Sequence, residues 1–247
     1  MDELKLIRGK EIIINIENKP DKNIVLYQPS IDKICDFGEE SFTNTFRHLC
    51  IIPSDIKSVL WDSGIDYMKI SDFELFIMVS RGISNKDTSL ILGDINLSEM
   101  IPMKKSENDE IVLYNQQEDY YIDEKIYEEM ISYIRAMFGF VPKVEKAGNK
   151  FTKKILIDED RDKRKNIKET EFQSIIVPQI ITLVNTEELN YNYKTIFNLT
   201  LYQLNKSLWQ VYKKKEKCAL LQGRMSGFID TSKIKPKDLQ WMYEPEK

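Results

Sequence analysis

The sequence predicts an α+β fold, with β-hairpins and short helices in the N-terminal part followed by a mostly helical C-terminal part. Two patterns support this prediction. Before residue 123, short runs rich in isoleucine, valine and tyrosine flank polar turns, which is typical of hairpins. Beyond residue 150, apolar residues recur largely at the three- and four-residue spacing of helices.

The first expected element is a β-hairpin formed by residues 11–16 and 23–27. Ser30 follows the second strand, and its hydroxyl is suited to cap the first turn of a helix. From residue 31 to about residue 79 the apolar spacing is mainly helical. Gly38 is expected to divide this stretch, because glycine readily adopts the conformations that end helices.

A second hairpin is expected from residues 100–103 and 110–114, with residues 120–122 as a third strand. Asp123 then caps a helix whose apolar residues fall on one face, and Gly139 ends it. Local signals mark both ends of this helix, so its position is well defined by the sequence.

A domain boundary is predicted at residues 140–150, which contain a proline, a glycine and three lysines. It separates an α+β domain at residues 1–140 from a helical domain at residues 151–247. In that second domain we expect helices at residues 151–165 and 169–184, the latter kinked or shortened by Pro178.

The last predicted helix is long, from about residue 199 to residue 225, with Asn198 as its N-cap. Its apolar residues fit helical spacing only in part. Glycine at position 227 is expected to end it, because glycine tolerates the backbone conformation found after helices.

Composition limits the class of protein. Charged residues make up 31% of the chain and hydrophobic residues 42%, which fits a globular protein. No apolar run approaches the ~20 residues that a membrane-spanning helix needs, and no signal peptide is evident. The cysteines Cys35, Cys50 and Cys218 are odd in number and widely spaced, so we expect free thiols. The sequence therefore predicts a soluble protein of a reducing, intracellular compartment.

Residues suited to nucleophilic catalysis are scarce. His48 is the only histidine, and it precedes Cys50 by two positions on a predicted helix. Side chains two positions apart on a helix do not face each other, so a Cys-His pair is not expected there. The phosphate-binding glycine-rich motifs are also missing. We therefore expect a protein that is not an enzyme and has no cofactor, with a dispersed carboxylate site as the remaining catalytic alternative.

One acidic segment comes close to a metal motif. Asp158, Asp160 and Asp162 match positions 1, 3 and 5 of a calcium-binding loop, but Lys163 stands where that loop requires glycine. The favoured interpretation is a charged helix face with pairs such as Asp160–Arg164. The sequence thus predicts no metal site.

Two basic clusters, at residues 161–168 and 213–217, could contact a phosphate backbone. Each is mixed with acidic residues or flanked by them, and the formal net charge of the chain is −4. A solvated helix face is the favoured interpretation of both clusters, and nucleic-acid binding stays as an alternative.

Aromatic residues offer a different indication, because tryptophan and tyrosine are enriched at the centres of protein–protein interfaces. The candidates for a partner-binding surface are Trp209 on the last long helix and three consecutive residues near the end, Trp241, Met242 and Tyr243. Core packing competes with this interpretation at every such position.

The C-terminal sequence resembles a known family. Residues 219–234 contain the pattern Gly-x-x-Ser-Gly-x-Ile-Asp after a long helix, and Leu239-Gln240-Trp241 follows. This is similar to the ending of proteins encoded in the tail-morphogenesis gene clusters of phages that infect Gram-positive bacteria. Three further stretches, at residues 52–57, 71–76 and 143–158, are similar to the same family in order and spacing.

The resemblance implies a tail assembly chaperone-like protein in the host cytoplasm. Such a protein would bind the tape-measure or tail-tube proteins without catalysing a reaction and without contacting a membrane, and self-association is compatible with this role. Two alternatives stay open: a structural component of the tail or neck of the virion, and a nucleic-acid-associated phage factor that uses the two basic clusters.

Overall fold

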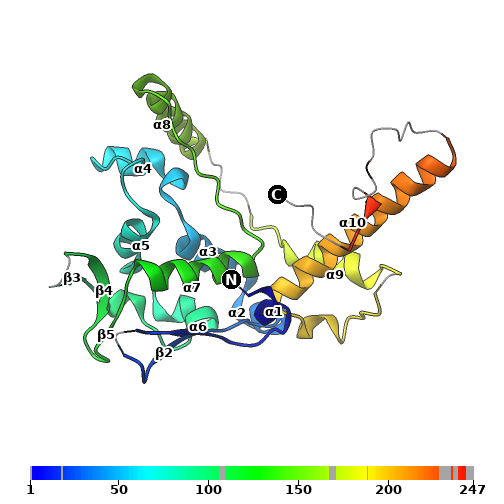
Figure 1. Ribbon diagram of the computed structural model, residues 1–247, viewed down its shortest axis with the longest axis horizontal. Helices are drawn as coiled ribbons and strands as arrows, with labels where there is room; N and C mark the ends of the chain where they lie inside the picture. Colours follow the sequence, from blue (N-terminus) through cyan, green and yellow to red (C-terminus); the bar gives the residue numbers. More distant parts are fainter. Residues whose placement is uncertain are drawn as a thin grey trace.

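The computed structural model describes residues 2–17, 19–105, 109–166, 171–187, 189–227, 235 and 239–242 (Figure 1). Antiparallel strand pairs and short helices form the N-terminal part, and helices dominate after them. The predicted α+β class is therefore confirmed.

The first hairpin is present as predicted. Short helix α1 (Glu3–Ile7) leads into β1 (Ile12–Asn15), which pairs antiparallel with β2 (Asn23–Leu26). Ile12 pairs with Leu26 and Ile14 with Ile24, and all four of these side chains are buried. Alternate residues of a strand face opposite sides, so this register turns one face of the hairpin toward the core.

Helices α2 (Ile31–Phe37) and α3 (Glu39–Cys50) follow. The Ser30 hydroxyl accepts a hydrogen bond from the Lys33 amide, and Gly38 separates the helices with a φ of 101°. Both predictions are thus confirmed. The chain then forms five short elements: η1 (Pro53–Asp55), α4 (Lys57–Asp62), α5 (Asp72–Ser80), α6 (Asn85–Leu92) and η2 (Leu97–Glu99).

The second sheet has three antiparallel strands in the order β3 (Ile101–Lys104), β4 (Ile111–Asn115) and β5 (Tyr120–Ile122). Helix α7 (Glu124–Met137) begins directly after it, and an Asp123 carboxylate oxygen accepts a hydrogen bond from the Ile126 amide. The predicted third strand and the predicted cap are both confirmed.

The C-terminal part contains α8 (Lys150–Lys165), α9 (Ile176–Val184), η3 (Ile196–Asn198) and α10 (Leu201–Met225). The predicted start of the second of these helices at residue 169 is wrong. Pro178 occupies the first turn of α9, where backbone N–H groups have no acceptor within the helix, so the helix starts just before the proline.

The prediction of Asn198 as the N-cap of the long helix is also wrong, because Asn198 ends the 3-10 turn η3. Thr200 is the cap. Its hydroxyl accepts from the Gln203 amide at 3.3 Å, while the Gln203 side chain accepts from the Thr200 amide at 2.9 Å. This reciprocal pair is a capping box, and it fixes where α10 starts. Gly227, with a φ of 72°, follows the end of α10.

One large apolar core extends from α1 to α10, and it includes residues from both predicted domains. A second, smaller cluster lies between α4, α5 and α8. In Figure 1, α8 stands next to α4 on one side of the molecule, and α10 extends away on the other side. The division at residues 140–150 stays a prediction.

Candidate partner-binding site

Helix α10 carries Trp209, the first of the predicted partner-binding residues. The first half of this helix is held by apolar side chains that face the core, among them Leu204, Leu208 and Val211. It packs against α1, α7 and α9. Trp209 lies in the same part of the helix and is 37% exposed.

Trp209 and Trp241 line a common groove of about 410 Å³. The backbone carbonyl of Trp241 accepts a hydrogen bond from the Gln210 side chain at 2.9 Å, which holds this part of the chain against α10. Trp241 is 37% exposed and Met242 is more exposed still, whereas Tyr243 lies outside the described residues. The structure therefore brings together two predicted side chains that are far apart in the sequence.

The other residues that line the groove were not predicted from the sequence. They come from three separate segments and include Ile7 of α1, Leu189 before η3, and Lys206 and Lys214 of α10. Their separation explains why sequence patterns miss them. Local spacing applies only to the lining residues of α10 itself, such as Lys206, one turn before Trp209.

Lysine side chains lie close to both indole rings. The Lys213 ammonium is 4.0 Å from the centre of the Trp209 ring, and that of Lys214 is 5.8 Å from the centre of the Trp241 ring. An ammonium over an aromatic face is attracted by the electron density of the ring. None of the described residues that line the groove is acidic. The groove thus combines an apolar floor with positive charge at its edge.

An apolar strip lies on the neighbouring helix α9. Ile176, Ile180 and Leu183 of this helix are buried against the core. Val177 and Ile181 lie on the outer face and are about half exposed. A surface helix normally has a polar outer face, so a helix that is apolar on both sides indicates an additional contact surface.

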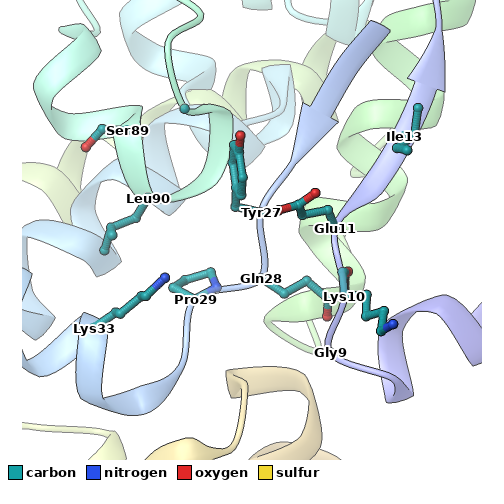
Figure 2. Close-up of a pocket in the computed structure, with 11 residues that line it drawn as sticks. Gly9, Lys10, Glu11, Ile13, Tyr27, Gln28, Pro29, Lys33, Ser89 and Leu90 are labelled. Atoms are coloured by element: carbon teal, nitrogen blue, oxygen red, sulfur yellow. Dashed lines mark hydrogen bonds between the residues drawn. The ribbon is translucent and has the colours of Figure 1, made fainter.

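A larger groove, of about 670 Å³, lies on another part of the surface, between the first hairpin and α6 (Figure 2). Figure 2 shows the Tyr27 ring between Leu90 of α6 and the Glu11 side chain next to β1. Gly93 lies against this ring, since a Cβ atom there would be 2.6 Å from Tyr27 Cε2. The sequence did not predict this groove, because its residues come from three separate segments, 9–13, 27–33 and 89–93.

The structure also places the residues considered for catalysis and for metal binding. His48 is exposed on α3 while Cys50 is buried, so the two side chains do not meet on one face. Burial raises the pKa of the Cys50 thiol, with the nearby Arg135 opposing it. In the described part of the chain, no three histidine, cysteine or acidic side chains are grouped so that they could hold a metal ion.

The acidic segment around Asp160 is helical, as favoured from the sequence, and Asp160 pairs with Arg164 at 3.1 Å. Arg161 is also paired, with Asp62 and Asp158. These pairs involve Arg161 and Arg164 of the first basic cluster, of which residues 167 and 168 lie outside the described range. Among the described residues, no helix is long and apolar enough to cross a bilayer.

Comparison with known proteins gives one similarity. Residues 166–244 match the family described as the YomV second domain, which is a phage-associated family. The match contains α9, α10 and both tryptophans of the groove. No curated protein and no solved structure matches the chain.

Proposed function

We propose that this protein is a non-enzymatic assembly factor of a bacteriophage, which binds the tape-measure or tail-tube protein before the tail assembles. One observation carries the proposal. Trp209 and Trp241 line one groove, and both lie within the region similar to a phage-associated family. Partly exposed tryptophans in a groove are typical of the residues that contribute most to protein–protein binding.

The proposed mechanism is contact without chemistry. A client protein that forms a tube or a long helical bundle exposes apolar surface until its own subunits meet. The groove offers two indole rings, and the outer face of α9 adds the apolar side chains of Val177 and Ile181. Covering the client with this surface would keep it from premature association.

Co-purification tests the proposal. The tagged protein is expressed with the tape-measure protein and, separately, with the tail-tube protein of the same phage. The wild-type chain should retain one of them, and Trp209→Ala should weaken that binding by about 2 kcal/mol, or roughly thirtyfold. Tyr212→Ala is the matched control, because Tyr212 is an exposed aromatic residue of the same helix outside the groove.

Two results would contradict the proposal: retention of neither tail protein, or equal weakening by Trp209→Ala and Tyr212→Ala. A structural role in the virion is distinguished by the mature particle. The protein should be missing from purified virions if it acts only during assembly, and present at a fixed stoichiometry if it is a component of the tail or neck.

Nucleic-acid binding is a second candidate, and a specific observation supports it. Lys213 and Lys214 lie next to Trp209 and Trp241, and single-strand binding proteins combine positive charge with aromatic rings in this way. Titration with an oligothymidylate at low salt, followed by tryptophan fluorescence, tests this candidate. Binding that weakens steeply with added salt would favour it over a protein client.

A further inference from the structure

Helix α8 is attached to the rest of the protein in an unusual way. Of its 16 residues only Ile157 is buried, and this side chain completes the small cluster formed with Leu60, Tyr67 and Leu75. This cluster is separate from the main core. The chain on its N-terminal side, residues 140–149, forms neither helix nor strand. Figure 1 shows α8 packed on α4 at the end of this segment.

Helix α8 supplies the N-terminal cap that α4 lacks in its own sequence. The residue before α4 is Ile56, which has no side-chain oxygen to accept hydrogen bonds from the first turn. Asp160 of α8 takes this role, because its Oδ2 atom accepts from the Ser58 amide at 2.9 Å and from the Ser58 hydroxyl at 2.6 Å. A helix start favours a negative charge as well as an acceptor, so Asp160 acts as a cap from another helix.

Lys153 adds a second polar contact beside the apolar one. Its ammonium pairs with Asp66 at 2.5 Å and lies 5.2 Å from the centre of the Trp61 ring. The three contacts follow one face of α8, because Lys153, Ile157 and Asp160 are spaced four and three residues apart. Along this face the surface of α4 and the loop after it contacts a cation, an apolar side chain and an acid in turn. Beside this face, Arg161 of α8 pairs with Asp62 of α4.

We infer that this surface is a helix-binding site, that α8 is its built-in occupant, and that a partner helix with the same pattern takes the place of α8. The surface consists of Ser58, Leu60, Trp61, Asp66, Tyr67 and Leu75. One buried apolar residue and several partly exposed ion pairs hold a helix less firmly than a core does. The inference goes beyond the proposed function, since it concerns a second surface and does not depend on any tail protein.

Charge complementarity defines the partner. The surface presents the Asp66 carboxylate at one end and the uncapped start of α4 at the other. It would therefore accept an amphipathic helix that carries a lysine or arginine four residues before its apolar side chain and an aspartate or glutamate three residues after it. A helix with the charges exchanged would place like charges together at both ends.

The test uses α8 itself as the probe. A fluorescein-labelled peptide of residues 150–165 is titrated against the full-length chain and against its Ile157→Asp variant, with fluorescence anisotropy as the readout. The variant places a charge in the apolar cluster, so its own α8 should leave the site. The peptide is expected to bind this variant at least tenfold more tightly than it binds the wild-type chain.

Two peptide variants give specificity. Asp160→Asn in the peptide removes the charge that caps α4 and should weaken binding several-fold. Asp162→Asn is the matched control, because Asp162 is exposed and lies outside the contact. Equal binding of the two altered peptides would overturn the inference, as would no binding of the original peptide to the Ile157→Asp chain.

Hydrogen exchange of the unmodified protein provides a measurement that does not depend on a variant. Release of α8 requires that its amides exchange through an opening that leaves α7 closed. We expect the amides in the middle of α8 to be protected at least tenfold less than those in the middle of α7. Equal protection of the two helices would mean that α8 opens only when the whole protein unfolds, and would overturn the inference.

Discussion

Helices α8 and α9 are neighbours in the sequence, yet they are attached to the protein in opposite ways. Helix α9 buries Ile176, Ile180 and Leu183 in the main core. Helix α8 buries one isoleucine in a small separate cluster and makes its other contacts through charged side chains. Apolar burial is far more stabilising than partly exposed ion pairs, so α8 should detach from the rest of the folded protein more readily than α9.

The regions around α8 and α9 also share one feature. The residues directly before α4 and α9 have no capping side chain, and a distant carboxylate caps each of these two helices. Asp160 accepts from the first turn of α4, and Glu39 accepts from the Ile175 and Ile176 amides at 2.6 and 2.9 Å at the start of α9. A cap supplied from elsewhere makes the helix start depend on tertiary structure. The comparison thus separates apolar burial, which differs between α8 and α9, from capping by a distant carboxylate, which occurs both at the α4–α8 contact and at the start of α9.

The largest expected effect is at Leu183, which is fully buried in α9. Leu183→Ala removes apolar contact and leaves a cavity in the main core, so we expect the free energy of unfolding to fall by about 3 kcal/mol. Urea denaturation followed by circular dichroism measures this change. Val177→Ala on the outer face of the same helix should change stability by no more than about 0.5 kcal/mol. Similar losses from both substitutions would show that α9 is not held through its inner face.

The next effect concerns Ile157 in α8. Ile157→Ala should weaken the contact between α8 and α4 by about 2 kcal/mol, at the lower end of the range for such substitutions. Because this cluster is separate from the main core, the loss should appear as faster hydrogen exchange in α8, with little change in α7. Ile155→Ala, at an exposed position of the same helix, is the control. An equal increase in α7 would mean that the two clusters unfold together.

The sequence predicts those parts of the fold that local signals define. Both hairpins, the Gly38 break and the Asp123 cap rest on residues within a few positions of the element concerned. The start of α9 was misplaced because its position depends on Pro178 and on Glu39, which lies 137 residues before Ile176. In the sequence, Glu39 looks like one of two solvated acids.

The candidate site shows the same limit. Trp209 and Trp241 could be selected as aromatic candidates, but nothing in the sequence indicates that they line one groove. Ile7 and Leu189 join them only through the packing of α1 and α10 and the course of the chain before η3. A groove formed by separate segments has no periodic pattern of its own, so it becomes visible only when the chain is folded.

The stabilisation of α9 by its distant cap is tested at Glu39. Glu39→Ala removes the acceptor of the first amides of α9, and we expect the free energy of unfolding to fall by about 1 kcal/mol. Glu40→Ala is a matched control, because both acids lie in the first turn of α3 and interact similarly with the dipole of that helix. The difference between the two variants in urea denaturation isolates the cap of α9. No difference would mean that the Ser174 hydroxyl, which accepts from the Val177 amide, is a sufficient cap alone.

The smallest expected effect is a pH dependence confined to the α4–α8 contact. Burial alone would raise the pKa of Asp160, but the hydrogen bonds from Ser58 and Arg164 outweigh burial and lower this pKa. The hydrogen bond from Lys153 lowers the pKa of Asp66, and that from Lys57 lowers the pKa of Glu145. A carboxyl group whose pKa is lower in the folded state stabilises that state above its unfolded pKa, and the stabilisation is lost as the pH falls.

The contact should therefore be unchanged between pH 7 and about pH 5 and should weaken below about pH 4, near the unfolded pKa of these acids. A variant with Trp209→Phe and Trp241→Phe leaves Trp61 as the only tryptophan, and its fluorescence reports on Lys153 above the ring. Adding Asp160→Asn to this variant should reduce the change in Trp61 fluorescence with pH, because one of the three titrating groups is then missing. A transition centred above pH 5, or one that Asp160→Asn leaves unaltered, would show that the carboxylates around α4 do not control the docking of α8.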